Sequence, residues 1–180
     1  LALALAPVPL RVVGPVGTQR LVDRTMDMLA DDIGYRLAHH DDLTEGPQVE
    51  VTEVEPDDGL TEVLVEGGVR VQAAPTDHAP VRPTLGYRVT HDGATAVIAG
   101  DTIPCPGLDR LCAGADVYVQ TVVRPDLIAQ IPVARLQDIL DYHSSVEQAA
   151  QTAARAGVGQ LVLTHPVPPP GPGTEQEWID

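Results

Sequence analysis

The sequence contains no lysine and few basic residues of any kind. Arginine supplies all 11 basic side chains, against 26 aspartates and glutamates, and the formal net charge is −15. A surface this acidic repels phosphate backbones, so non-specific nucleic-acid binding is disfavoured unless basic residues gather locally. A local phosphate site is still allowed, because a bound divalent metal can outweigh nearby carboxylates.

Cysteine is scarce, and long apolar runs are absent. Cys105 and Cys112 are too few for a disulfide framework and suit a reducing compartment, from which we expect a cytoplasmic protein. No run approaches the length of a membrane-spanning helix. The opening Leu-Ala-Leu-Ala-Leu-Ala-Pro has no basic lead and no initiator methionine, so we expect the interior of a longer gene product rather than a signal peptide.

The sequence does contain enough apolar residues for one sizeable core. It has 180 residues, of which 43% are hydrophobic, and nothing in the pattern requires two domains. A strand is predicted over residues 10–13. The Gly-rich turn at 14–18 lacks the lysine and the spacing of a phosphate loop, so we expect Thr18 to cap the next helix.

Helical spacing of apolar residues predicts that next helix over residues 19–33. An acidic segment follows over residues 36–58, and we interpret it as a solvated connector. His39 and His40 lie near its start beside two aspartates, which leaves a surface metal site as the alternative there.

From about residue 60 the hydrophobic period changes to two, which is typical of strands. Ser144-Ser145-Val146-Glu147 reads as a capping box that opens an alanine-rich helix, and Gly157 is expected to close it. Strands alternating with helices at this spacing predict α/β layers. The predicted strands cover residues 61–65, 69–74, 86–90, 95–99, 116–122 and 160–163.

Three potential metal ligands stand at the ends of such extended runs: His78, Asp101 and His165. The two oxygens of a carboxylate diverge, so Asp101 could bridge two cations. Taken alone, an aspartate after a strand is more often a turn former, and a single histidine there is more often not a ligand. Three such residues in one short chain favour a shared metal site, and we expect them to converge on one pocket.

His143 stands in a different position, directly before the capped helix and beside Ser144. An imidazole titrates near neutral pH, so His143 could donate a proton to a leaving oxygen. A histidine that helps to cap the helix is the alternative.

At these residues the chain resembles the metallo-β-lactamase superfamily and, within it, the ribonuclease Z branch, which matures tRNA 3′ ends. The resemblance covers about residues 10–170. It implies an α/β fold, a four-layer αββα sandwich, with two zinc ions at the edge of its sheets. The segments that carry it are His78 with Leu85-Gly86-Tyr87-Arg88, Gly100-Asp101-Thr102, Ala113-Gly114-Ala115-Asp116-Val117, Tyr142-His143-Ser144-Ser145 and Leu161-Val162-Leu163-Thr164-His165.

The resemblance also implies a role for each candidate residue. His78 looks like a ligand of the first zinc, Asp101 like the carboxylate that bridges both ions, and His165 like a ligand of the second. His143 looks like the catalytic histidine that gives its proton to the leaving alkoxide. The implied reaction is an in-line attack on the phosphorus of a phosphodiester, with precursor tRNA as the family's default substrate and a homodimer by analogy.

Three departures from the family pattern keep other interpretations open. The His-x-His-x-Asp-His motif is missing, so we expect residues 1–180 to form a single partial domain, incomplete at its N-terminus, with the C-terminus also open. Gln120-Thr121-Val122-Val123 stands where the branch shows His-Glu-Ala-Thr, and His91-Asp92-Gly93 turns where many members insert a long arm. The alternatives are a hydrolase of a small phosphodiester or sulfate ester, and an inactive, metal-free fragment that serves as an interaction module.

Overall fold

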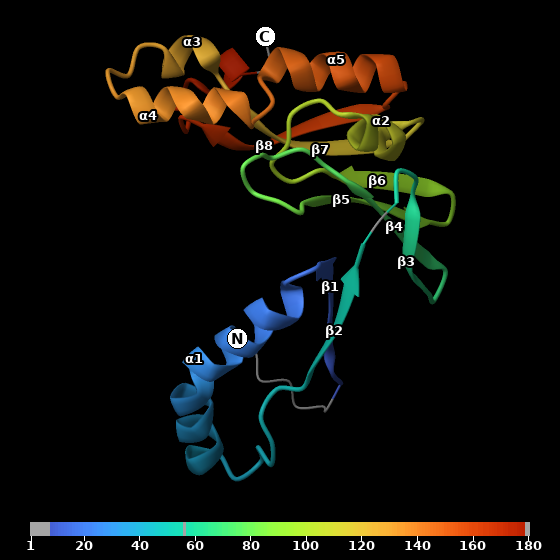
Figure 1. Cartoon of the computed structure of the whole chain (residues 1–180), viewed down its shortest axis with the longest axis vertical. Helices are drawn as coiled ribbons and strands as arrows, with labels where there is room; N and C mark the ends of the chain where they lie inside the picture. The colour runs from blue at the N-terminus through green and yellow to red at the C-terminus, as the bar shows by residue number, and fades with distance from the viewer. Residues whose placement is uncertain (1–7, 56, 179–180) are drawn as a thin grey trace. The chain divides into compact units, whose positions relative to one another are not determined.

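The computed structural model describes residues 8–55 and 57–178. The chain divides into two compact units, and the described residues of each lie within Leu1–Glu55 and Pro56–Asp180. Each unit is described by itself (Figure 1). The opening Leu-Ala repeat lies outside the described residues, as do the last two residues of the chain. Within the described ranges, no helix combines the length and the apolar character that crossing a bilayer requires.

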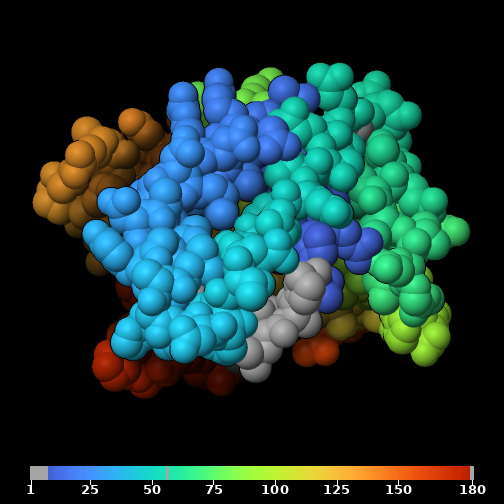
Figure 2. All heavy atoms as spheres, turned by 90° about the horizontal axis from the view of Figure 1, so that it is seen from below, coloured from blue at the N-terminus to red at the C-terminus, as the bar shows by residue number. Residues whose placement is uncertain are grey.

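The first unit is a strand–helix–strand arrangement. Strand β1 (Leu10–Pro15) and strand β2 (Val49–Val54) pair in parallel, and helix α1 (Thr18–His39) connects them. Figure 2 shows this helix in blue, with side chains at the surface of the view. The prediction of a connector over residues 36–58 was wrong at β2, because the pairing that makes this segment a strand is with a segment far away in the sequence.

The backbone N–H groups at the start of α1 are hydrogen bonded to a side chain of β2 and not to the predicted cap residue. The Glu53 carboxylate accepts hydrogen bonds from the backbone N–H groups of Gly17, at 2.7 Å, and Gln19, at 3.0 Å. Thr18, which was expected to cap the helix, instead donates its hydroxyl to the Pro15 carbonyl at 2.6 Å. A carboxylate near a helix N-terminus is also favoured by the helix dipole.

The second unit contains a six-stranded sheet in the order β3-β4-β5-β6-β7-β8. Strands β3 to β6 pair antiparallel, whereas β6, β7 and β8 run parallel, so that the carboxyl ends of these three strands meet at one edge of the sheet. Each strand predicted in this region is present. Their bounds are β3 (Thr61–Glu66), β4 (Val69–Pro75), β5 (Leu85–His91), β6 (Ala94–Ile98), β7 (Val117–Val123) and β8 (Gln160–Val167).

The predicted alanine-rich helix is also present, with its cap one residue later than expected. Ser145 is the N-cap: its hydroxyl accepts from the Gln148 N–H at 3.1 Å, while the Gln148 side chain accepts from the Ser145 N–H at 2.9 Å. Gly157 closes the helix in the left-handed conformation, as predicted. The helical elements are α2 (Pro106–Cys112), α3 (Pro125–Ile128), α4 (Ala134–Gln137), η1 (Asp138–Asp141), α5 (Val146–Ala156) and η2 (Glu175–Trp178).

The core of the second unit lies between one face of the sheet and helices α2 and α5, which Figure 1 shows beside β7. Residues of the opposite face are less covered, and Ile98 on that face is 51% exposed. The sheet therefore has one closed face and one open face. The buried core residues are Ala74, Val97, Ala99, Leu108, Leu111, Cys112, Ala115, Tyr118 and Ala153.

Candidate metal centre

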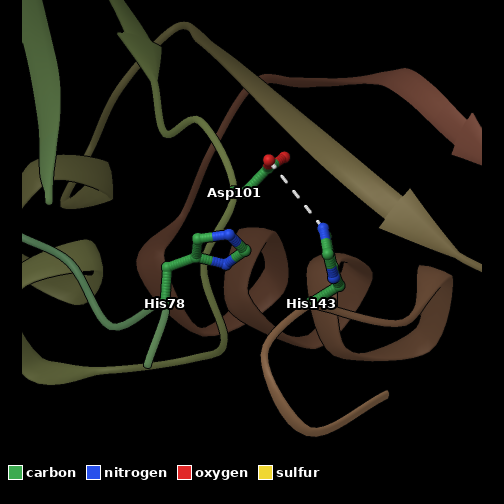
Figure 3. A group of neighbouring side chains, drawn as sticks. All are labelled: His78, Asp101 and His143. Atoms are coloured by element: carbon green, nitrogen blue, oxygen red, sulfur yellow. Dashed lines mark ion pairs between the residues drawn. The ribbon is translucent and has the colours of Figure 1, made fainter. Parts of the chain in front are cut away.

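Three side chains from three separate segments converge near the carboxyl ends of the sheet strands. His78, Asp101 and His143 each offer one potential ligand atom, and these atoms all lie within 4.8 Å of one another (Figure 3). The Nε2 atom of His143 lies 3.8 Å from the Asp101 Oδ2 atom. Of the three residues expected to converge, the structure thus brings together His78 and Asp101, and His143 joins them.

His78 is oriented by the segment that carries His143. Its Nδ1 atom donates a hydrogen bond to the Tyr142 carbonyl at 2.8 Å. Because a carbonyl can only accept, Nδ1 carries a proton, and in the neutral ring Nε2 then keeps its lone pair. The ring stands edge-on to the His143 ring, with the two centroids 5.0 Å apart.

His143 follows the same arrangement. Its Nδ1 atom donates to the Ile139 carbonyl at 3.0 Å, and its Nε2 atom faces Asp101. The side chain is 12% exposed, so solvent reaches it only in part. Imidazoles that bind metals usually donate the other ring N–H to a carbonyl or carboxylate, and both histidines of the cluster do so.

Asp101 stands in a turn that is held from strand β7. The preceding residue, Gly100, has a φ of 68°, a left-handed conformation in which glycine is not strained. Its carbonyl accepts hydrogen bonds from the Thr121 hydroxyl at 3.0 Å and from the Gln120 amide at 3.2 Å. Gln120 and Thr121 stand where the resembled branch shows its His-Glu pair, and here they fix the start of the Asp101 turn.

The support of this turn extends into the core. Gln120 is completely buried, and its side-chain oxygen accepts from the Tyr118 hydroxyl at 2.5 Å. Burial raises the pKa of Tyr118 far above its ordinary value, so the hydroxyl stays protonated and acts as the donor. This network was not predicted from the sequence, although a glutamine inside a largely buried strand signals a buried hydrogen bond.

His165 is placed differently from the other three candidates. It lies in β8 with a φ of 46°, at the point where the pairing between β7 and β8 shifts register, and it is exposed. Its neighbour Thr164 pairs with Thr121, so it belongs to the same end of the parallel strands as the cluster. Its ring nitrogens are not among the atoms grouped within 4.8 Å.

The donor set of the cluster suits a zinc ion. Zinc binds imidazole nitrogen and carboxylate oxygen at about 2.0–2.2 Å, and catalytic zinc sites commonly have three protein ligands and an open fourth position. His78 and Asp101 offer one imidazole nitrogen and one carboxylate to such a ligand set, and the Nε2 atom of His143 lies beside them. Within the described residues this is the one group of three such side chains, and His39 and His40 are not part of another.

Comparison with known proteins gives close matches over nearly the whole chain. A family model described as "Beta-lactamase superfamily domain" matches residues 5–166. Ribonuclease Z of Mycobacterium avium is 58% identical over 172 residues, which are 96% of this chain and 60% of that protein. Ribonuclease Z of Mycobacterium tuberculosis (strain H37Rv) is 53% identical over 97% of this chain and 63% of its own length.

Solved structures agree on the fold. The crystal structure of human tRNase Z, short form, superimposes with a TM-score of 0.65 at 23% identity, over 91% of this chain and 62% of that one. A metallo-β-lactamase fold protein from Bacillus subtilis, YhfI, gives a TM-score of 0.52 at 22% identity, over 72% of this chain and 48% of its own. At these identities the likeness concerns the fold alone. The chain spans less than two thirds of the two ribonuclease Z relatives described above.

Proposed function

We propose that this chain, which belongs to the metallo-β-lactamase superfamily and is a homologue of ribonuclease Z, is part of a metal-dependent phosphodiesterase that cleaves precursor tRNA at its 3′ end. The observation that carries the proposal is the His78–Asp101–His143 cluster, built at the carboxyl ends of the strands. The identity of 53–58% to proteins named ribonuclease Z supports the substrate.

The proposed cofactor is a pair of zinc ions, held in part by this chain. His78 would bind the first ion, Asp101 would bridge both, and His165 would bind the second. A left-handed φ is uncommon outside glycine, and bulges often redirect side chains near active sites. The φ of 46° at His165, at the register shift in β8, therefore supports a functional role for this residue.

In the proposed mechanism His143 supplies the proton. When bound, zinc provides Lewis-acid stabilisation of the charge on the phosphoryl oxygens. In the imidazolium form, His143 carries a proton on Nε2 as well, and this nitrogen lies 3.8 Å from the Asp101 carboxylate. The Ile139 carbonyl holds the ring through Nδ1. The oxygen of an attacking water forms the new bond to phosphorus as the bond to the alkoxide breaks. Nε2 gives its proton to the alkoxide, and the proton released by the water restores the imidazolium.

The first experiment tests the metal site through Asp101. A full-length version that carries the His-x-His-x-Asp-His motif and its Asp101→Ala variant are compared for zinc content by atomic emission and for cleavage of a 3′-extended tRNA. If Asp101 bridges the ions, the variant loses zinc and any activity together. Stoichiometric zinc retained by the variant would count against the bridging role. A native chain that binds no zinc under saturating conditions would favour the metal-free interaction module instead.

The second experiment distinguishes two roles of His143. Its place in the cluster would also allow it to be a metal ligand, which the 4.8 Å grouping favours. A proton donor predicts that His143→Ala keeps its zinc while turnover falls, by about 10²- to 10⁴-fold for a lost general acid. If the variant loses zinc in proportion to activity, His143 belongs among the ligands.

A second candidate function keeps the same site and changes the substrate to a small phosphodiester or sulfate ester. It is favoured by the β5–β6 connection, where Asp92-Gly93 closes a tight hairpin at the place where many tRNA-processing members insert an arm. The net charge of −15 points the same way, because it weakens attraction to RNA. Salt-dependent binding and cleavage of precursor tRNA would favour the first function; activity on bis(p-nitrophenyl) phosphate alone would favour the second.

The finer architecture we propose is a four-layer αββα sandwich of which residues 1–180 form a single partial domain. The open face of the six-stranded sheet supports it: Ile98, Val119 and Val162 lie side by side in register, and Ile98 and Val162 are 51% and 36% exposed. In a sandwich, such a face is covered by a second sheet. The family match across residues 5–166 includes parts of both units, which supports one domain.

Two further expectations stand beside these proposals. The two-cysteine composition suits a reducing compartment, so we propose the cytoplasm as its location. A homodimer is proposed by analogy with the resembled family. Sedimentation of the purified chain at several concentrations tests it, since a dimer dissociates on dilution.

A further inference from the structure

We propose that Thr102 is a positioning residue that ties together the three segments of the metal centre. The inference deepens the proposed function and rests on the metal site described there. Thr102 is completely buried, directly follows Asp101, and is hydrogen bonded to residues adjacent to both His78 and His143. Asp101 is therefore next to Thr102 in the sequence, and His78 and His143 are each next to a residue that is hydrogen bonded to Thr102.

The first connection runs to the His78 segment. The Asp77 backbone N–H donates to the Thr102 hydroxyl oxygen at 3.0 Å. One residue further along, the Ile103 N–H donates to the Asp77 carbonyl at 2.9 Å, so the two segments form a short antiparallel bridge. His78 follows Asp77 directly, and its backbone position is therefore fixed relative to the Asp101 turn.

The second connection runs to the His143 segment. The Ser144 hydroxyl donates to the Thr102 carbonyl at 2.7 Å, and Ser144 is itself 1% exposed. The Ser144 carbonyl accepts from the Val123 N–H at 2.9 Å, which anchors the same segment to the end of β7. His143 precedes Ser144, so its backbone is fixed relative to Asp101 as well.

The single proton of the Thr102 hydroxyl is already committed. The hydroxyl accepts from the Asp77 N–H and donates to the Ile103 carbonyl at 2.8 Å, and the Cys105 sulfur lies within hydrogen-bond range at 3.9 Å. A buried donor that loses its acceptor costs more than the hydrogen bond contributed, so the buried site specifies one geometry. The Gln120–Thr121 pair, in contrast, holds the Asp101 turn from the Gly100 side.

The test compares three variants of the full chain. Thr102→Val removes the hydroxyl but keeps the shape, and Thr102→Ser keeps the hydroxyl. Thr152→Val is the matched control: Thr152 is equally buried, and its hydroxyl donates to the Gln148 carbonyl within helix α5. Binding of cobalt(II) is followed by its visible absorption and by competition with zinc, and thermal unfolding is recorded for each variant.

If Thr102 positions the ligands, Thr102→Val weakens cobalt binding by about 10- to 100-fold, as outer-shell changes at metal sites do, and alters the absorption bands. Thr102→Ser restores both. Thr152→Val lowers the melting temperature to a similar degree and leaves cobalt binding unchanged. Equal weakening in Thr102→Val and Thr152→Val, or native cobalt binding and spectrum in Thr102→Val, overturns the inference while the proposed function stands.

A native chain that binds no cobalt or zinc overturns the proposed metal site, and the inference is then decided by a measurement without metal. The His78 and His143 rings lie with their centroids 5.0 Å apart, close enough for proton–proton nuclear Overhauser effects between them. These signals should disappear in Thr102→Val and persist in Thr152→Val. Their persistence in Thr102→Val overturns the positioning role.

Discussion

The two longest helices show that a helical pattern and a buried helix are different things. Helix α1, in the first unit, has 22 residues and none of them is buried, whereas α5, in the second unit, has 11 residues and buries Ala149, Thr152 and Ala153. Most of the stability of a protein helix comes from the packing of its apolar face. The extent to which each helix is buried is therefore decided by its packing partners and not by its length or periodicity.

The N-terminal caps of the two helices also differ, in how far away along the chain the capping side chain lies. The cap of α5 is local, a reciprocal pair between Ser145 and Gln148 within the first turn. The cap of α1 comes from Glu53, which is 34 residues away from Gln19. The second unit thus combines local signals with a core, whereas the first depends on a pairing between distant segments.

The largest expected effect is on the reactivity of thiols, which tests whether the core of the second unit excludes a chemical reagent. Burial, with the Asp109 carboxylate nearby, raises the pKa of the Cys112 thiol from 9.0 to about 12. At pH 8 its reactive thiolate is then roughly a thousand times rarer than that of an ordinary thiol. We expect Cys105, which is half-buried, to react first with a disulfide reagent, and Cys112 only after urea unfolds the chain. Rapid reaction of both thiols in the native chain would contradict a closed core in the second unit.

A second test removes apolar contacts from each unit. Leu111 in α2 is completely buried, and Leu111→Ala should lower the free energy of unfolding by about 2–5 kcal/mol. The control is Leu21→Ala on α1, where the side chain is 66% exposed and the change should be within about 0.5 kcal/mol. Urea unfolding followed by circular dichroism measures both. A large effect of Leu21→Ala would show that α1 has a packing partner in solution.

The smallest effect is expected at the helix caps. Ser145→Ala removes the local capping box of α5 and should cost about 1 kcal/mol of stability. Glu53→Ala removes the acceptor at the start of α1, but the N–H groups there are exposed, so water can replace it and the cost should be within about 0.5 kcal/mol. Urea titrations of the two variants would sharpen the comparison, and an equal or larger effect of Glu53→Ala would contradict it.

Elements specified by local pattern were predictable, and the connections between them were not. The six strands of the second unit and the α5 helix follow from alternation and capping signals in their own sequence. Strand β2 was missed because its partner β1 lies across the whole of α1. The capping box was placed one residue early, since Ser144 and Ser145 are both suitable caps and only the fold uses Ser144 elsewhere, as a donor to Thr102.

At the candidate site, the sequence identified residues but not distances. His78, Asp101 and His143 were singled out from their positions at strand and helix ends, and His165 by the same criterion. That the first three fall within 4.8 Å could not be read from spacings of 23 and 42 residues along the chain. The supporting residues Gln120, Thr121 and Thr102 were not recognised in this role, because a buried hydrogen bond is visible only when both partners are placed.

By itself, the sequence determined the α/β class, the positions of the strands along the chain in the second unit and the residue types able to bind a metal, because these depend on periodicity and side-chain chemistry. The tertiary structure alone decided which imidazoles face Asp101, which ring nitrogen each leaves free, and which buried threonine joins their segments. The physical reason is that hydrogen bonds between distant segments depend on distances of a few ångströms, and such distances follow from the packing of the whole sheet rather than from any stretch of it.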